Sequence, residues 1–546
     1  MMLRLTSSAL ALAAMTAPAL ADVTSEQVWQ SWVDYYQSLG YTMTEGGRDK
    51  SGETLTVSDI SIKGGAPESK VAFVIPQVTL TEDGSGKVKT VFADKMTGIA
   101  TGQNTEGEAY EVPFAIEMPG NAITTSGAAG DMTHEFDYPQ IDMSTTTMKT
   151  AGTEKPLPLK LGVADSTGTF HIVSGPSAKY DYDMKSGKIT FSADMPETEG
   201  EHVKLDGTMD GAAVTGEMTV PGGTKVEEDM NAALKAGMAL NGVLKAGALV
   251  ANFDFAGTSD EGQPQTGSGK YDGKGFDLSY ALSQDGMSYQ AGSDAGKFSL
   301  TTSDVPFPIE YAIDSGSFDM QMPVMKSDEA QPFKFAYSLA GLTLGDGIWN
   351  LFDAQGKLPR DPASLDIDVT GTAKVTSDLF DQTAATADDA DADGDGDAAP
   401  ADATDDATAD GMTDAAPADD AEAAADSAAE ADADAAPQPF EPVDVTINQF
   451  ALNALGAKVT AEGALKAPEG GDITTPVGKI DATYEGVNGL IDKLGAMGLI
   501  PQDQIMGVRM MLAMFAKPVT EGEDKLATQL EFKADGTIFA NGQQIK

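Results

Sequence analysis

The stretch FDLSYALS, residues 276–283, carries the pattern that decides the fold of this chain. Its large apolar side chains occupy every second position, at Phe276, Leu278, Tyr280 and Leu282. A period of two places these side chains on one face of a half-buried strand. Asp-Gly pairs, which favour hairpin turns, flank the stretch at 272–273 and 285–286. The pattern therefore predicts one strand of an antiparallel sheet.

The same alternation recurs along most of the chain. Its clearest runs are Val112, Phe114, Ile116 and Met118; Ile189, Phe191 and Ala193; Leu365, Ile367 and Val369; Val443, Val445 and Ile447; and Leu526, Thr528, Leu530 and Phe532. The apolar phase slips between Val57 and Ile60, which predicts a β-bulge at Ser58-Asp59. Further hairpin turns are expected at the Asp-Gly pairs 83–84, 206–207 and 210–211.

Helical periodicity replaces this alternation in a few segments. Thr24 and Gln27 form the sequence of a capping box, and Gly40 is suited to end the helix that follows. Trp29 and Trp32 share one side of it, and we expect them to plug the sheet rather than to form an aromatic ligand platform. Further helices are expected near 226–244, at 487–497 and at 501–516, the last with Ile505, Val508, Leu512 and Phe515 facing inward.

An acidic tract at 381–440 interrupts the patterned sequence. It contains 19 acidic residues and no Lys or Arg. Such a segment buries too little apolar surface to offset its ordering entropy, so we expect a disordered linker. Strands are expected immediately before and after it, which favours one architecture, formed by 22–380 and 441–546, with an enlarged loop. The sequence thus predicts a mainly β (β-rich α+β) fold, a large curved or two-layer antiparallel sheet with a few covering helices and a disordered acidic insertion.

The net charge restricts the partners of the chain. It is −50 at pH 7, and the chain without the tract still carries −31. Nucleic-acid binding needs clustered Lys and Arg, and the only arginines after the first 21 residues are Arg48, Arg360 and Arg509. Anionic membrane surfaces are disfavoured for the same reason. The charge favours cations or neutral, apolar molecules as small partners.

The first 21 residues have the pattern of a secretory signal peptide. Arg4 precedes an apolar run from Leu5 to about Met15, and Ala19-Leu20-Ala21 is a cleavage site ahead of Asp22. We therefore expect export to the periplasm. After cleavage no window approaches ~20 apolar residues, so no transmembrane span is expected. There is no Cys, so stability has to come from a core instead of disulfides.

Several short motifs together resemble a known family. They are the Trp-rich first helix, Pro306-Phe307-Pro308-Ile309-Glu310, the run Ile348–Asp353 with Leu358–Pro362, and the ending Leu530–Gln543. In this order they resemble domain-of-unknown-function family 2125, a group of alphaproteobacterial exported envelope proteins. The resemblance implies a periplasmic setting and provides no catalytic residues. A more distant similarity to envelope proteins with long curved sheets, some thought to handle lipids, is an analogy of fold.

Motifs for common enzyme chemistry are missing from the sequence. His134, His171 and His202 are the only histidines, and none has the His-Glu-x-x-His spacing of a zinc hydrolase. There is no Gly-x-Ser-x-Gly elbow and no P-loop Lys followed by Ser or Thr. We therefore expect no catalytic residues, no cofactor and no built metal site.

Two weaker patterns remain as alternatives. Asp391, Asp393, Asp395, Gly396 and Asp402 have the spacing of a calcium loop without flanking helices, which favours weak counterion binding. The 85 acidic residues also offer many carboxylate pairs for glycan hydrolysis, although a solvated surface explains any single pair better.

The aromatic cluster around Trp349 is ambiguous in the same way, and we expect it to be core at the end of the sheet rather than a sugar or lipid groove. The favoured function is a non-catalytic, envelope-associated protein that binds an apolar small molecule or an envelope protein. The alternatives are an exported carboxylate-dependent glycan hydrolase and a calcium-responsive acidic envelope protein.

Overall fold

The structure is a computed structural model. It describes residues 22–381 and 439–546, apart from short gaps at 39, 67–68, 105–106, 197–200, 225, 227–228, 260–261 and 469–472. The described strands form a single 31-stranded sheet, and the pairings between them are antiparallel. This confirms the predicted mainly β fold. The predicted signal peptide at 1–21, nearly all of the predicted disordered linker at 381–440 and the calcium-loop pattern at 391–402 lie outside the described residues.

The N-terminal part is a helix surrounded by a rolled portion of the sheet. The helix α1 spans Ser25–Ser38. The strands of this rolled portion are β1 (Thr42–Thr44), β2 (Gly47–Ser51), β3 (Thr54–Ala66), β4 (Ser69–Glu82), β5 (Val88–Phe92), β6 (Lys95–Gln103), β7 (Ala109–Glu117) and β8 (Ala122–Ala128). Thr24 and Gln27 exchange the two hydrogen bonds of the predicted capping box. The predicted bulge is not present: Asp59 has a φ of 51°, but the β3–β4 register continues without a shift from the pair of Ser58 and Gln77 to the pair of Ile60 and Ile75, so the two strands bend together there.

The main core lies beneath α1. Trp29 and Val28 are fully covered by apolar residues of β3, β4 and β5, which confirms that the Trp-rich helix plugs the sheet. The N-terminus of α1 is held by Glu82, whose Oε1 accepts hydrogen bonds from the Ser25 backbone N–H and from Lys50 Nζ. The hydrogen bonds from Lys50 and Ser25 lower the pKa of Glu82 to about 2.

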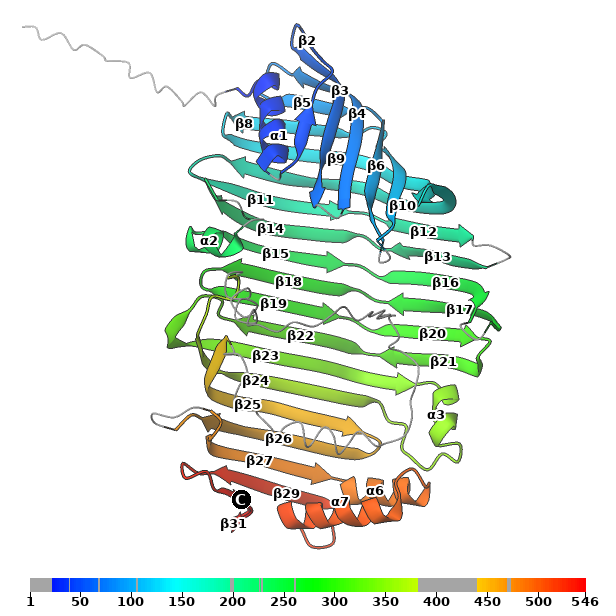
Figure 1. Cartoon of the computed structure of the whole chain (residues 1–546), viewed down its shortest axis with the longest axis vertical. Coiled ribbons are helices and arrows are strands. Elements are labelled where there is room, and N and C mark those ends of the chain that lie inside the picture. Colours follow the sequence, from blue (N-terminus) through cyan, green and yellow to red (C-terminus); the bar gives the residue numbers. More distant parts are fainter. Residues whose placement is uncertain are drawn as a thin grey trace, which may run out of the picture.

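Two long strands, β9 (Asp131–Thr150) and β10 (Thr153–Val173), begin the middle of the sheet. The next twelve strands stand in two columns (Figure 1). One column contains β11 (Ser177–Ser186), β14 (Ala212–Pro221), β15 (Ala239–Ala246), β18 (Phe276–Ser283), β19 (Gly286–Ser293) and β22 (Ser315–Met322). The other contains β12 (Ile189–Pro196), β13 (His202–Met209), β16 (Leu249–Thr258), β17 (Pro264–Gly273), β20 (Gly296–Thr302) and β21 (Val305–Ile313). Both columns meet β23 (Ser327–Leu344).

The two columns are halves of the same long strands. Met209 of β13 pairs with Leu249, and Ala212 of β14 pairs with Ala246, so the register is identical on both sides of the break. Backbone hydrogen bonds bridge the break itself, from Asp210 to Ala248 and from Gly247 to Gly211. The chain therefore crosses the whole sheet and bends midway along a line, which we call the fold line.

The fold line corrects part of the turn prediction. Asp210-Gly211 lies on the fold line within a long strand, and Asp206-Gly207 lies inside β13, so neither is a hairpin turn. Asp272-Gly273 likewise ends β17 directly before the fold line. The pairs at 83–84 and 285–286 do stand at connections between neighbouring strands, β4–β5 and β18–β19. A left-handed residue such as Gly211, with φ of 85°, suits a bend as well as a turn.

The helix expected near 226–244 is much shorter. Helix α2 spans only Met230–Lys235, and Ala239–Ala246 forms the strand β15. Leu234 and Met238 do face the sheet, where they pack against Leu240 and Leu282. Pairing of β15 with both β14 and β18 supplies hydrogen bonds along its length, which outweighs the helical spacing of its leucines.

The remaining elements complete the sheet and its lower end. They are α3 (Asp346–Phe352), β24 (Ala363–Val375), β25 (Phe440–Ala454), β26 (Ala457–Lys466), β27 (Val477–Glu485), α6 (Val487–Ala496), α7 (Gln502–Phe515), β28 (Lys517–Pro518), β29 (Lys525–Phe532), β30 (Ile538–Ala540) and β31 (Gln543–Gln544). Strands β24 and β25, which flank the acidic tract, pair directly, with Val375 opposite Phe440. The predicted helical hairpin is present as α6 and α7. Val508, however, is exposed instead of facing inward.

Candidate functional site

One face of the sheet is apolar from the rolled N-terminal part to the last long strand. Directly paired residues of neighbouring strands lie on the same face, so a row can be followed across the sheet. One row crosses fourteen strands and contains no Asp, Glu, Lys or Arg: His134, Phe170, Tyr182, Gly216, Gly242, Tyr280, Tyr289, Met320, Phe335, Val369, Ile447, Gly463, Ile480 and Leu530. We call the surface to which this row belongs the apolar face.

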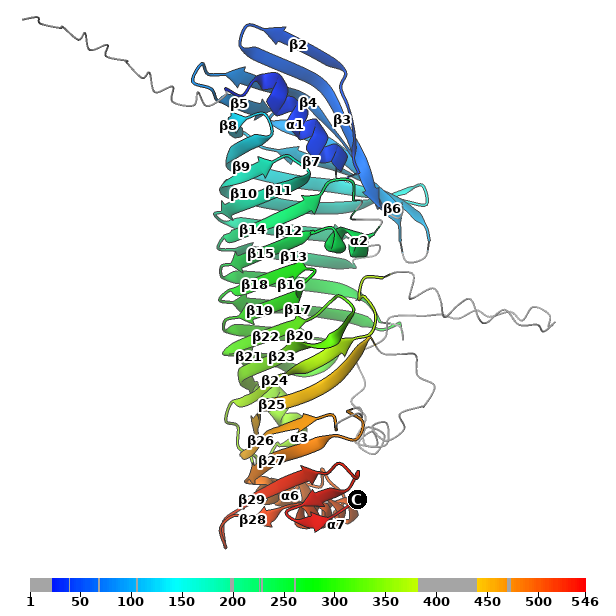
Figure 2. The same cartoon turned by 90° about the vertical axis from the view of Figure 1, so that its left-hand side faces the viewer.

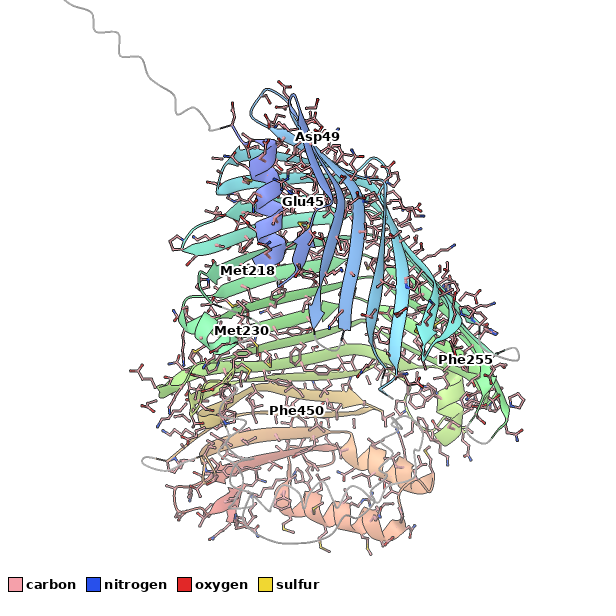
Figure 3. All side chains as sticks on the ribbon, turned by 45° about the horizontal axis from the view of Figure 1, so that its top comes forward. Glu45, Asp49, Met218, Met230, Phe255 and Phe450 are labelled. Carbon is pink, nitrogen blue, oxygen red and sulfur yellow. The ribbon has the colours of Figure 1, made fainter. Side chains whose placement is uncertain are left out.

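The second column has an equivalent row. It consists of Met143, Leu161, Phe191, Gly207, Ala251, Tyr271, Phe298 and Tyr311. In β9, Met132 of the first column and Ile141 of the second contact the same core cluster, so both columns present their apolar residues to one side. Met218, Phe255 and Phe450 mark three places on this face in Figure 3.

The apolar positions keep to one side because their spacing changes at the fold line. Within each half-strand they are two residues apart, but across the fold line they are three apart. This spacing recurs at 186 and 189, 209 and 212, 246 and 249, 273 and 276, 293 and 296, and 313 and 316. Each bend thus places two successive residues on the opposite side, as a bulge does. The spacing keeps the apolar face continuous across both columns.

The opposite face is polar. The neighbouring row in the first column runs through Asp181, Glu217, Asn241, Ala281, Ser288, Gln321, Lys334, Thr370, Thr446, Ala464, Lys479 and Glu531. Ion pairs join Lys334 to Asp319 and Lys479 to Glu531 on this side. The charges of this strongly acidic chain are therefore segregated to one side of the sheet.

Much of the apolar face is uncovered among the described residues. Helix α1 covers its upper end through Trp32 and Tyr35, and α2 covers Leu240 and Leu282. Figure 2 shows both helices on the same side of the strand stack. Elsewhere ten large side chains of this face have 37–42% of their surface exposed: Met143, Leu161, Met184, Val203, Leu205, Phe276, Tyr289, Tyr311, Phe335 and Leu452. Monomeric soluble proteins rarely expose so extended an apolar surface.

Aromatic rings lie flat on this face because glycines stand opposite them. The directly paired residues are Phe114 and Gly98, Tyr182 and Gly216, Phe191 and Gly207, Phe253 and Gly269, Phe255 and Gly267, Tyr280 and Gly242, and Phe333 and Gly371. A β-carbon on any of these glycines would overlap the opposite ring. Each ring therefore lies over the neighbouring strand instead of standing away from the sheet, which leaves the space above the face open.

The apolar face forms a hollow of about 560 Å³ where the sheet rolls over itself. Strands β4, β6, β7, β9 and β10 line it with Phe73, Phe114, Ile116, Met143 and Leu161, among other residues. This volume is within the usual range for a small-molecule site.

The polar atoms on the apolar face remain neutral. Tyr182 and Tyr280 hydrogen-bond to each other through their hydroxyls at 2.9 Å. Desolvation and this bond raise the pKa of Tyr182 to about 12. Burial raises the pKa of Tyr138 as well. Near neutral pH, therefore, these phenols add no charge to the face.

His134 is the one histidine on this face, and α1 covers it. Its Nδ1 lies 2.8 Å from Thr125 Oγ1, its ring packs on Trp32 at 4.7 Å, and no described group hydrogen-bonds to its Nε2. Burial lowers the pKa of His134 to about 4. The other two histidines lie at the surface, His171 between Asp131 and Asp181, and His202 beside Asp254. The described residues contain no cluster of three or more side chains able to hold a metal ion.

The other predicted site residues do not converge. Asp22 opens the described chain, whereas Ala19 and Ala21 of the cleavage site and Asp391, Asp393, Asp395, Gly396 and Asp402 of the calcium pattern lie outside the described residues. Trp349 is buried on α3 beside Phe352, with the Arg360 guanidinium 5.3 Å from its ring, as expected for core. None of the described helices is long and apolar enough to cross a membrane.

The amino-acid sequence predicted the strands but not the face that they build. The alternation of Phe276–Leu282 and of Ile189–Ala193 identified apolar positions, and both sets lie on the apolar face. The three-residue spacing at the fold line and the glycines opposite aromatics were signals that could have located the rest. They become readable only once the register shows which residues are paired.

A comparison with protein families gives one match. A family model described as "Uncharacterized protein conserved in bacteria (DUF2125)" matches residues 217–542, more than half of the chain. These residues include the motifs at 306–310 and 348–362, while the Trp-rich helix α1 precedes them. No curated protein and no solved structure matches the chain. The chain therefore belongs to DUF2125, a family of uncharacterised bacterial proteins.

Proposed function

We propose that this protein binds the hydrocarbon chains of lipids along its apolar face. The observation that carries the proposal is the row of fourteen uncharged residues from His134 to Leu530, in a chain that has 85 acidic and 35 basic residues. An exposed apolar surface of this extent marks a binding surface. Its continuity across the fold line distinguishes it from scattered surface residues.

The chemistry of the face favours hydrocarbon chains over peptides. Gly, Phe, Leu and Met side chains offer no hydrogen bonds, and Tyr182 and Tyr280 already bond to each other. A peptide laid on such a surface would leave polar groups unpaired unless it satisfied them itself. A methylene chain has no polar group to satisfy, and each CH₂ removed from water gains about 0.8 kcal/mol before ordering costs.

The dimensions suit several chains. Fourteen strands about 4.8 Å apart give the face a length of roughly 60 Å. One leaflet of a bilayer has hydrocarbon about 15 Å thick, half of the ~30 Å core. The face is therefore several times longer than one lipid tail, and the hollow at its upper end provides a more enclosed position for a tail.

The proposed setting is the periplasm, and the proposed role is not catalytic. Arg4, the apolar run after it and the cleavage sequence up to Ala21 support export. A lipid carried through an aqueous compartment needs its tails shielded from water, which is what an apolar face supplies. The motifs quoted above provide no nucleophile or metal ligand set for a reaction on the lipid.

The proposal is tested by crosslinking at two adjacent residues that point to opposite faces. A photoreactive benzoylphenylalanine replaces Phe191 on the apolar face in one variant and Thr190 on the polar face in the other. The full chain is expressed in bacteria, irradiated in cells and analysed by native mass spectrometry. We expect lipid adducts at 191 and none at 190. No adduct at 191 together with no co-purified lipid, or a peptide adduct at 191, would refute the proposal.

A further inference from the structure

Helix α7, at the lower end of the molecule in Figure 1, carries several exposed methionines. Met506, Met510 and Met514 are spaced four residues apart, so they share one side of the helix. Their exposed fractions are 71%, 69% and 50%, and Met511 is 56% exposed. The inner side of α7 carries Ile505, Leu512 and Phe515, which are partly buried. The methionines are therefore not needed to pack α7 on the rest of the fold.

Two further exposed apolar residues flank α7 in the sequence. Leu499 before α7 and Val519 after it are 42% and 52% exposed. Methionine side chains are flexible and polarizable and adapt to varied partners. We call the surface of Met506, Met510, Met511 and Met514 with these two residues the methionine face.

The charge of this region differs from that of the chain. Residues 487–519 contain two acidic and three basic residues, whereas the whole chain has a net charge of −50. On α7 itself the charged side chains are Asp503 and Arg509, and Arg509 pairs with Asp492 of α6. A zwitterionic surface, which has no net charge, therefore meets little local net charge here.

We propose that the methionine face of α7 lies on the surface of a lipid bilayer. An apolar helix face with little net charge can insert its side chains ~5–10 Å into the headgroup boundary without crossing the membrane. Helix α7 is too short to cross, since it has 14 residues. The inference stands on α7 alone, but it extends the proposed function, because contact with a bilayer would give lipid tails a route to the apolar face.

The alternative occupants fit less well. A second copy of this acidic chain would bring two strongly negative molecules together around a small helix face. A protein partner would ordinarily find a polar rim with hydrogen-bonding groups around the apolar centre. Contact with a bilayer requires neither a second acidic protein nor a hydrogen-bonding rim around the apolar residues.

The inference is tested with a single fluorescent label, since the chain has no cysteine. An environment-sensitive dye is attached to Cys in Met510→Cys and, as a matched control, in Leu351→Cys, whose leucine is 69% exposed on α3. Neutral phosphatidylcholine vesicles are then added to the labelled full chain. We expect a blue shift and increased emission at position 510 and no change at 351. In flotation, Met506→Ser/Met510→Ser/Met514→Ser should reduce vesicle binding roughly tenfold or more.

Three outcomes would overturn the inference: an unchanged spectrum at 510, flotation of the triple variant equal to that of the original chain, or a dimer that the triple variant dissociates in the absence of vesicles. We expect the triple variant to fold, because the three substituted positions are exposed, and thermal melting checks that it does. Crosslinking at 191 in the triple variant separates the two proposals. If lipid adducts form at 191 but the original chain does not bind vesicles, only the inference is refuted. If vesicle binding depends on α7 but no lipid adducts form at 191, only the proposed function is refuted.

Discussion

At the scale of single residues, His134 shows how the apolar face tolerates a titratable group. It lies under Trp32 and beside Phe170, and the only described hydrogen-bond partner of its side chain is Thr125. Burial favours the neutral imidazole, which lowers the pKa of His134 to about 4 from an ordinary value near 6.5. The unfolded chain therefore binds this proton more readily than the folded chain does.

This difference makes stability depend on pH. Between pH 6.5 and 4 only the unfolded state protonates at His134, so the free energy of unfolding falls as the pH falls, by up to about 3 kcal/mol. Urea unfolding at a series of pH values measures the loss, and His134→Phe should remove it. Hydrogen bonding to Asp131 and Asp181 raises the pKa of His171, so its contribution has the opposite sign and is lost as pH rises above about 6.5. If His134→Phe lost as much stability between pH 6.5 and 4 as the original chain does, the prediction for His134 would be contradicted.

Glycines opposite aromatic rings are a second feature at the residue scale. In Gly269→Ala the new methyl group would overlap the ring of Phe253 and approach the Ser299 carbonyl. Such overpacking should destabilise the protein by about 1–3 kcal/mol and turn the ring into the space above the face. Chemical denaturation measures the loss of stability. Lipid crosslinking at 191 should decrease if the ring turns into the space above the face.

Gly257→Ala is the matched control for this change. Gly257 lies in β16, close to Phe253, and a β-carbon there meets nothing within 4 Å. Its φ is not in the left-handed region, so alanine should be neutral or slightly stabilising. Equal effects of the two substitutions would show that the ring–glycine contact has no special role.

At the scale of elements, the fold line is the feature that joins local sequence to the site. The alternation within each half-strand was predictable, because period two is a strong signal. The bend was not, because Asp-Gly was assigned to hairpins that need a chain reversal. Whether Asp210-Gly211 bends or reverses the chain depends on the partners of the next strand, β14, which are Ser177–Ser186 of β11 and Ala239–Ala246 of β15. That information is non-local, so it cannot be read from the turn itself.

Deleting Gly211 tests the fold line. If the pairing of Met209 with Leu249 is kept, Ala212 takes the place of Gly211 at the fold line, so Val214 and Met218 would move to the polar face. We therefore expect loss of cooperative unfolding in this part of the sheet and fast hydrogen exchange in β14 and its neighbours β11 and β15. Deletion of Gly262, in the loop between β16 and β17, leaves every alternation unchanged and is the control. If hydrogen exchange in β14 stayed as slow after the Gly211 deletion as in the original chain, this account of the fold line would be disproved.

Element boundaries show the same limit of sequence analysis. The helical hairpin of α6 and α7 was predictable from Pro501 and the helical spacing that follows it. The strand at 239–246 was not predictable, because the spacing of Leu240 and Leu244 fits a helix and a strand equally. Pairing with β14 and β18 decided in favour of the strand.

At the scale of the whole molecule, a single-layer sheet explains why so much apolar surface stays exposed. The larger buried cluster lies under α1 and a smaller one under α2, while the strands between and below them have no second layer among the described residues. Composition and alternation predicted a large sheet, but they could not show whether a second layer covers it. Lipid tails on the apolar face would take the place of that layer, which links the architecture to the proposed function.

The acidic tract provides the last prediction, at this same scale. Its flanking strands β24 and β25 pair directly, and the Thr376 N–H donates to the Pro439 carbonyl, so the ends of the tract already lie side by side. Removing 382–437 therefore replaces a long connection with a short one across an existing strand pair, and shortening a loop costs no contacts. We expect the melting temperature to stay equal or rise by a few degrees, with the same small response to calcium as the full chain. A Gly/Ser segment of equal length is the control that separates charge from length. A fall in melting temperature, or a calcium response that only the natural tract provides, would show that the tract contributes contacts or a cation site, contrary to its composition.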